Sequence, residues 1–302
     1  MITIAPHLWF DKEAREASKF YVSVFGGDSR VTSATPIEDT PSGDAELVTF
    51  TLLGQDFLAI SAGPYFRFNP SVSLMVNFDP SRTADARQQL DAAWEKLAQG
   101  GTPLMPLDRY PFSERYGWIQ DRYGLSWQLI LTNPAGQPRP WIIPTLLFVG
   151  EQSGRAEEAG AFYRSVFGNT EPGLIARYGA NQPPDREGTL MFSDFRIENL
   201  WLAAMDSAHP HAFAFNEAVS LVVSCQTQQE IDRLWEMLSA RPEAEQCGWL
   251  KDRFGVSWQV VPAAMGRLMG GTREQRNRVT QTFLKMKKFD IAALERAYGG
   301  DA

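Results

Sequence analysis

One segment of the chain occurs twice. The stretch YGWIQDRYGLSWQLI, Tyr116 to Ile130, returns almost unchanged as CGWLKDRFGVSWQVV, Cys247 to Val261. The copies agree without a gap at Gly117, Trp118, Asp121, Arg122, Gly124, Ser126, Trp127 and Gln128 of the first copy. An internal repeat of this strength indicates that the chain consists of two related halves built to one plan.

A second repeated segment predicts a helix. AREASKFYVSVFG, Ala14 to Gly26, corresponds to AEEAGAFYRSVFG, Ala156 to Gly168, and the apolar residues of both copies fall at helical spacing. The closing glycine suits a left-handed C-cap. A short apolar run, IAPHLWF or IIPTLLF, precedes each helix, and strand-like runs such as ELVTFTLLG and TLMFSDFRI follow. The unit is therefore predicted to be βαβββ.

Each half supplies a second such unit. FRFNPSVSLMVNF, from Phe66, matches FAFNEAVSLVVSC, from Phe213, and a helical pattern follows both. Thr227 and Glu230 predict a capping box at the start of the later helix.

The predicted fold is α+β, with four βαβββ modules forming two domains, residues 1–137 and 138–302. The Pro- and Gly-rich stretch NPAGQPRP, Asn133 to Pro140, marks the joint between them. A helical tail is expected beyond Val261, and the first half has no equivalent of it.

Composition narrows the class of protein. A chain of 302 residues with 44% apolar residues can bury a core in each of two domains. With 36 acidic against 29 basic residues, nucleic acid is not an expected partner. No window approaches the roughly 18 apolar residues of a membrane span, so we expect a soluble, cytoplasmic protein without a membrane partner. Cys225 and Cys247 lack spaced Cys or His partners and are expected to be buried, reduced thiols.

These motifs resemble the vicinal oxygen chelate superfamily, which includes glyoxalases, bleomycin resistance proteins and extradiol (dihydroxybiphenyl) dioxygenases. Within it they look like the PhnB-like branch, labelled 3-demethylubiquinone-9 3-methyltransferase-like. The resemblance is carried by P-x-L-x-F-x-x-x-x-x-E-A-x-x-F-Y at the start, by G-W-x-x-D-R-x-G-x-x-W-Q in both halves, and by M-K-K-F-D-I-A-A-L in the tail. The resemblance implies paired modules that curl around a cleft. It also implies that two family domains are fused into a pseudo-dimer, which leaves further oligomerisation possible. The chain has no G-x-G-x-x-G stretch, so the residues do not support S-adenosylmethionine binding.

The resemblance also implies positions for a metal site. Metal-dependent members place a Glu on the last strand, seven residues after the turn Asp, and this sequence has Gln128 and Gln259 there. An amide is a neutral donor and a poor substitute for a carboxylate. The strand that opens the second module often gives a His, and the matching residues here are Ser73 and Ser220.

His7 lies near the first-strand ligand position, where the second half has Thr145. It is the one candidate metal ligand, although its offset from Asp11 can turn it to the other face of the strand. His209 and His211 flank Pro210 in a loop, which favours an ordinary turn over a chelating pair. In the Asp-Arg-x-Gly segments, Asp121 and the corresponding Asp252 are expected to cap turns rather than to act in catalysis.

Aromatic residues suggest the walls of a cleft. If Gln128 and Gln259 face inward, Trp127 and Trp258 point to the helices and belong to the core. Cleft candidates are Trp9, Trp118, Trp249, Phe66, Phe68, Phe213 and Phe215.

Taken together, the residues favour a protein that binds a small, largely apolar organic molecule in one cleft per half. Gln128, Gln259, Ser73, Ser220, Trp118, Trp249 and Trp9 are the expected ligand-binding residues, no catalytic residue is identified, and no cofactor is required. The alternative is a metal-dependent lyase, isomerase or dioxygenase that uses His7 and a divalent Zn, Ni, Mn or Fe ion. A third possibility is an interaction protein whose repeated halves and tail form a dimer surface.

Overall fold

The computed structural model describes residues 2–40 and 43–300, and it confirms the α+β fold. The first module contains β1 (Thr3–Phe10), α1 (Ala14–Phe25), β2 (Arg30–Thr40), β3 (Gly43–Leu52) and β4 (Gln55–Ser61). The second contains β5 (Val72–Phe78), α2 (Ala86–Leu97), β6 (Thr102–Tyr110), β7 (Ser113–Gln120) and β8 (Ser126–Leu131). The third contains β9 (Ile142–Phe148), the short 3-10 helix η1 (Gly150–Gln152), α3 (Ala156–Val166), β10 (Thr170–Arg177), β11 (Leu190–Ile197) and β12 (Leu200–Asp206).

The fourth module departs from the predicted pattern in one strand. It contains β13 (Val219–Cys225), α4 (Gln228–Leu238), the 3-10 helix η2 (Pro242–Ala244), β14 (Trp249–Lys251) and β15 (Ser257–Pro262). The connection after the helix, residues 98–115 in the first half, is only residues 239–246 here, so a counterpart of β6 does not form within this described segment.

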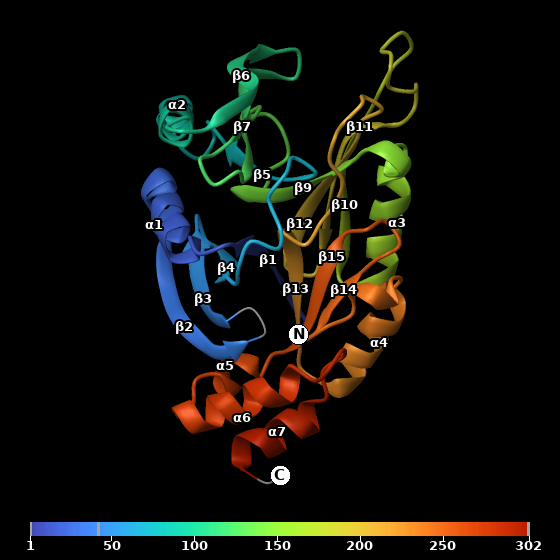
Figure 1. Cartoon of the computed structure of the whole chain (residues 1–302). Helices are drawn as coiled ribbons and strands as arrows, with labels where there is room; N and C mark the ends of the chain where they lie inside the picture. Colours follow the sequence, from blue (N-terminus) through green and yellow to red (C-terminus); the bar gives the residue numbers. More distant parts are fainter. Residues whose placement is uncertain (1, 41–42, 301–302) are drawn as a thin grey trace.

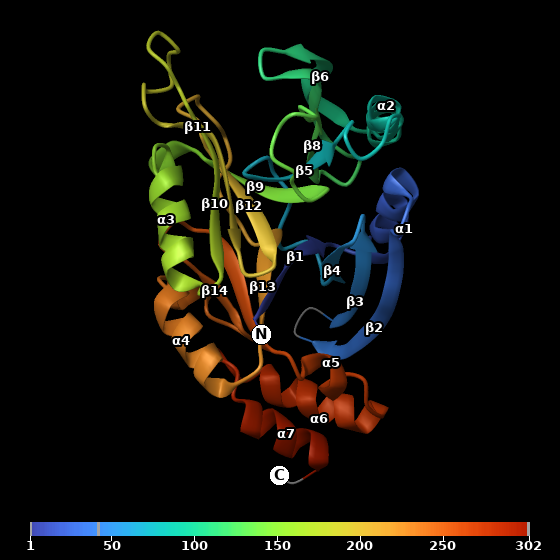
Figure 2. The ribbon, with the colours of Figure 1, turned by 180° about the vertical axis from the view of Figure 1, so that it is seen from behind.

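The C-terminal tail takes the place of that missing strand. It folds as α5 (Met265–Leu268), α6 (Arg273–Phe283) and α7 (Ile291–Gly299). Its backbone carbonyls at Met286 and Lys287 accept hydrogen bonds from the amides of Cys247 and Gly248, at 2.9 and 2.7 Å. In Figures 1 and 2 the tail lies across one end of the molecule, between β2 and the strands of the fourth module.

Both sheets are shared between the halves. The seven-stranded sheet has the order β14-β15-β13-β1-β4-β3-β2, and the eight-stranded sheet has the order β10-β11-β12-β9-β5-β8-β7-β6. The halves meet through two antiparallel pairs, β1 with β13 and β5 with β9. The first module therefore pairs with the fourth and the second with the third, which is the arrangement of a pseudo-dimer within one chain.

The helices, by contrast, pack against strands of their own half. Helices α1 and α2 lie on one flank of the molecule and α3 and α4 on the other (Figures 1 and 2). Trp127 of β8 packs against Tyr21 and Phe25 of α1, with ring centroids 5.1 and 5.0 Å apart. Trp258 of β15 packs in the same way against Tyr163 and Phe167. Both tryptophans are fully buried, as the strand alternation predicts.

The predicted turns form, although the helix ends differ from expectation. Asp121 and Asp252 each accept backbone N–H groups of their own turn and a tryptophan Nε1–H at 2.9 Å. Gly124 and Gly255 hold the positive φ that these turns need. Thr227 and Glu230 form the predicted capping box. The expected left-handed glycine caps are wrong, because Gly26 combines φ 60° with ψ −147° and α3 ends in extended backbone at Phe167.

Within residues 2–40 and 43–300, no helix is both long and apolar enough to cross a membrane.

Candidate functional site

The inner face of the seven-stranded sheet forms a cleft of about 1100 Å³. Ala5, His7 and Trp9 reach it from alternate positions of β1, and β13 and β15 of the second half supply further lining residues. The tail contributes Met265 and Phe283. This corrects the expectation of one cleft per half, because a sheet shared between the halves gives a cleft that belongs to both.

His7 lies on the floor of this cleft. It faces Ser220 across the β1–β13 ladder and is only 3% exposed. Burial lowers the pKa of His7 to about 3, so the imidazole is neutral near pH 7. None of the described residues forms a hydrogen bond with its Nδ1. A buried nitrogen without a hydrogen-bond partner is costly to the folded state.

Gln259 lies on β15, next to β13 in the same floor. Its Nε2 donates a hydrogen bond to Ser220 Oγ at 3.0 Å, which fixes the orientation of the amide. The Oε1 atom is left to face the cleft, and no donor to it is found in the described part of the chain. Gln259 therefore presents a fixed, neutral acceptor.

Trp9 and Trp249 form an aromatic wall above this floor. Trp9 Nε1 donates to the carbonyl of Gly63 at 2.8 Å, and the two indole rings meet edge to face with centroids 6.0 Å apart. Trp249 also contacts the His7 ring edge to face, at 5.5 Å. The predicted residues His7, Trp9, Ser220, Trp249 and Gln259 thus come together at one place.

On the corresponding inner face of the eight-stranded sheet, the closed face, the central polar side chains are paired with one another. Gln128 Nε2 donates to Ser73 Oγ at 2.7 Å, as in the other sheet, but Gln128 Oε1 accepts a hydrogen bond from the Tyr116 hydroxyl at 2.7 Å. Trp118 Nε1 donates to Ser126 Oγ at 2.6 Å. The predicted residues of this face satisfy one another, and Gln128, Ser73 and Tyr116 are all buried.

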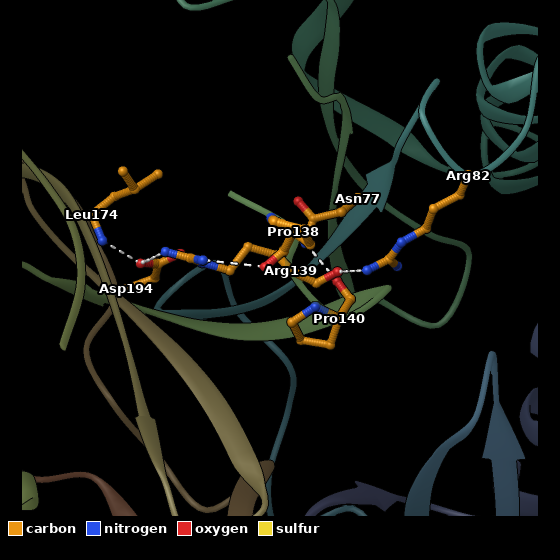
Figure 3. A network of polar contacts seen from close by, with 7 residues as sticks. All are labelled: Asn77, Arg82, Pro138, Arg139, Pro140, Leu174 and Asp194. Carbon is orange, nitrogen blue, oxygen red and sulfur yellow. Dashed lines mark hydrogen bonds and ion pairs between the residues drawn. The ribbon is translucent and has the colours of Figure 1, made fainter. Parts of the chain in front are cut away.

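A buried ion pair occupies the same face, and sequence reasoning missed it. Arg139 Nε and Nη2 donate to the two carboxylate oxygens of Asp194 at 2.6 and 3.2 Å (Figure 3). Leu174 N donates to Asp194 Oδ1 at 2.6 Å, and the guanidinium lies 4.2 Å from the Trp201 ring centre. A Cβ on Gly173 would come within 1.9 Å of Asp194 Oδ1, so this approach requires glycine.

The ion pair connects the segment that joins the halves to the inner face of the eight-stranded sheet. Arg139 belongs to the joint segment, whose Pro140 carbonyl accepts a hydrogen bond from Asn77 Nδ2 at 2.8 Å (Figure 3). Asp194 pairs with Ala203, which pairs with Thr145, the counterpart of His7. The only sequence signals were a lone arginine in the joint and a lone aspartate in an apolar strand.

The donor set around His7 does not fit a divalent metal ion. Its neighbours Ser220 and Gln259 offer neutral oxygens, which neither neutralise charge nor bind transition metals well. Within the described residues, no group of three or more His, Cys, Asp or Glu could hold a metal ion.

The remaining candidates lie outside the cleft. His211 Nε2 is 2.9 Å from Ser207 Oγ, and His209 Nε2 is 3.6 Å from Asp185. Phe68 packs on Phe10. None of the four candidate phenylalanines, Phe66, Phe68, Phe213 and Phe215, is among the residues that line the cleft.

Both thiols were expected to be buried, and the structure buries only one of them completely. Cys225 is fully buried, and burial raises its pKa to about 12. Cys247 is half-buried and lines the cleft.

The shared sheets and the paired inner faces define the class of protein as one with a glyoxalase-like fold. The fold is similar to glyoxalase I from Zea mays, with a TM-score of 0.55, 10% identity, and coverage of 89% of this chain and 96% of that chain. A family described as 3-demethylubiquinone-9 3-methyltransferase matches residues 2–130 and again residues 140–261, and the chain belongs to this family.

A solved relative covers about one half of the chain. The PhnB protein from Bacillus cereus is 37% identical over 42% of this chain and 98% of its own, with a TM-score of 0.38. No curated protein matches the chain.

Proposed function

We propose that the chain binds one small, largely apolar organic molecule in the cleft of the seven-stranded sheet, without an obligatory metal ion. The observation that carries the proposal is the contrast between the two inner faces. On one face the central glutamine is bonded at both ends of its amide, and the other has a cleft of about 1100 Å³ in which Gln259 Oε1 has no donor among the described residues. A concave apolar site with a few fixed polar groups suits a small organic ligand.

The charge of the lining favours an uncharged ligand. Among the described residues that line the cleft, Asp56 is the one formally charged side chain, and His7 is neutral. An anionic ligand would therefore meet no cation. Trp9, Trp249, Gln259 and Ser220 are the proposed binding residues, whereas the contacts of Gln128, Ser73 and Trp118 favour a structural role in the closed face.

The alternative of a metal-dependent lyase, isomerase or dioxygenase finds weaker support. His7 is the one imidazole in the cleft lining, and it lies beside an amide and a hydroxyl rather than a carboxylate. We do not carry over the methyltransferase activity in the family description, because the chain lacks a recognisable motif for the methyl donor. A cytoplasmic location, in keeping with two unpaired thiols, is part of the proposal.

Two measurements test the proposal. Untagged protein purified without chelator is expected to contain well under one transition metal ion per chain by mass spectrometry, and about one per chain would overturn metal independence.

The neutral dye Nile red is expected to bind once per chain. The Ser224→Trp variant, which places an indole in the cleft, should weaken binding at least tenfold.

Leu174→Trp provides the control for the added indole, because residue 174 is exposed and does not line the cleft. If Ser224→Trp and Leu174→Trp bind the dye equally well, the cleft is not the binding site.

A further inference from the structure

The closed face contains a phenol bound at the position that is open in the other sheet. Tyr116 and Cys247 occupy the same place in the repeated segment, and so do Gln128 and Gln259. The Tyr116 hydroxyl donates to Gln128 Oε1 at 2.7 Å while Ser73 holds the other end of the amide. On the inner face of the seven-stranded sheet, the open face, Ser220 holds Gln259 in the same way. There the residue at the position of Tyr116 is Cys247, with a thiol on a short side chain.

Cys247 does not take over the role of Tyr116. Its Sγ lies 3.5 Å from the carbonyl of Phe283 and 3.3 Å from Gln246 Nε2, so it contacts the tail and its own neighbour instead of Gln259. Two further positions differ in the same way between the faces. Thr145 Oγ1 donates to a backbone carbonyl, whereas none of the described residues bonds to Nδ1 of its counterpart His7. Ser126 accepts from Trp118, whereas Ser257 Oγ has no partner in the described part of the chain.

Aromatic rings surround the Tyr116 side chain, and other aromatic rings line the cleft of the open face. The Tyr116 ring meets Tyr110 and Phe112 edge to face, with centroids 5.4 and 5.0 Å away. Tyr110 ends β6 and Phe112 lies in the turn to β7, a segment without a counterpart among residues 239–246 of the second half. The tail instead brings Phe283 and Phe289 to the cleft, edge to face with each other at 6.1 Å. An aromatic ring placed there finds contacts of the same kind.

We propose that the ligand of this cleft is a phenol, that is, an uncharged hydroxyaromatic molecule whose ring takes the place of the Tyr116 ring and whose hydroxyl donates to Gln259 Oε1. The inference rests on the proposed function, because it names the class of molecule for the same cleft. The phenol binds in its protonated form, since Gln259 Oε1 can only accept and no cation among the described lining residues would stabilise a phenolate.

A matched pair of probes separates this inference from the broader function. In calorimetric titrations of the full chain, 2-naphthol is expected to bind at one site and at least tenfold more tightly than 2-methoxynaphthalene, which cannot donate a hydrogen bond. Equal affinities would overturn the phenol assignment while leaving an apolar site in place. Binding of neither probe, with Nile red still bound, would also overturn it. Failure of all three would remove the proposed function as well.

Gln259→Leu tests the hydroxyl contact directly. The variant is expected to bind 2-naphthol about tenfold more weakly and 2-methoxynaphthalene unchanged, and retained selectivity would overturn the assignment. Gln128→Leu, in the closed face, is the matched control and should leave both affinities unchanged.

Cys247→Tyr should place a ring from the chain itself in the cleft, which Cys247 lines, and weaken 2-naphthol binding, with Cys247→Ser as its control. Conversely, Tyr116→Ala should open a second site. Added p-cresol is expected to raise the melting temperature of Tyr116→Ala more than toluene does. If p-cresol and toluene have the same effect, the hydroxyl of Tyr116 is not what the site recognises.

Discussion

The two inner faces of this molecule share a central pair of residues but differ in the side chains around it. Both have a glutamine held by a serine at the centre of a shared sheet. In the eight-stranded sheet a tyrosine and a buried ion pair complete the polar contacts of the face. In the seven-stranded sheet the tyrosine is a cysteine, the strand register matches Asp194 with Thr49, and the face forms a cleft. A few side chains therefore distinguish two faces that are built to the same plan.

Breaking the ion pair should have the largest effect. Asp194→Ala leaves Arg139 largely buried without its counter-charge, and we expect a loss of about 3–5 kcal/mol in the free energy of unfolding. Urea unfolding followed by circular dichroism measures it. The double variant Arg139→Leu, Asp194→Leu should recover much of this loss, because it leaves no buried charge.

The corresponding residue of the open face provides the contrast. Thr49 Oγ1 makes hydrogen bonds with Thr32 and Ser33, all at an exposed position, so Thr49→Ala should cost about 1 kcal/mol or less. Similar losses for Asp194→Ala and Thr49→Ala would contradict the view that the ion pair closes its face.

The second prediction concerns pH and the open face alone. The unfolded chain takes up a proton at His7 near pH 6.5, whereas the folded chain does so only at about pH 3. Stability is therefore lost as the pH falls through 6.5 toward 3. Between pH 7.5 and pH 5 this loss amounts to about 2 kcal/mol.

His7→Thr copies the residue of the closed face and should remove this part of the pH dependence. Urea unfolding of both proteins at pH 7.5 and 5 measures the difference. An identical pH dependence in the two proteins would mean that His7 is not buried in its neutral form.

The smallest predicted effect concerns the hydroxyl that completes the closed face. Tyr116→Phe leaves Gln128 Oε1 buried without its donor, and we expect a loss of about 1–2 kcal/mol. Tyr110→Phe is the matched control, because its hydroxyl makes an exposed hydrogen bond with the Pro106 carbonyl and should contribute less than about 0.5 kcal/mol. Equal unfolding midpoints for Tyr116→Phe and Tyr110→Phe would show that the buried contact is dispensable.

Much of the fold could be predicted because its signals are local and repeated. Helix periodicity, the turn of Asp121 and the burial of Trp127 each depend on residues close in sequence, and each occurs twice. The family follows from the same segments. The missing strand of the fourth module could also have been found, since residues 239–246 are too few for a strand and its turn.

Pairing of modules across the halves could not be predicted, because β1 fits either β5 or β13 by its own apolar pattern. The sequence also suggested equal roles for Gln128 and Gln259. What separates them is their surroundings, namely the Tyr116 hydroxyl in one case and Cys247 turned toward the tail in the other. Arg139 and Asp194 lie 55 positions apart and meet only once the third module is folded. Such differences depend on tertiary contacts that a motif does not encode.

The sharing of both sheets has a consequence for how the chain could diverge. Two separate copies of one half could pair in the same way, but every substitution would then appear in both clefts at once. Joining the halves in one chain through Asn133 to Pro140 keeps their effective concentration high and removes that symmetry constraint. The two inner faces can therefore carry different side chains at matching positions, as Tyr116 beside Gln128 and Cys247 turned toward the tail show.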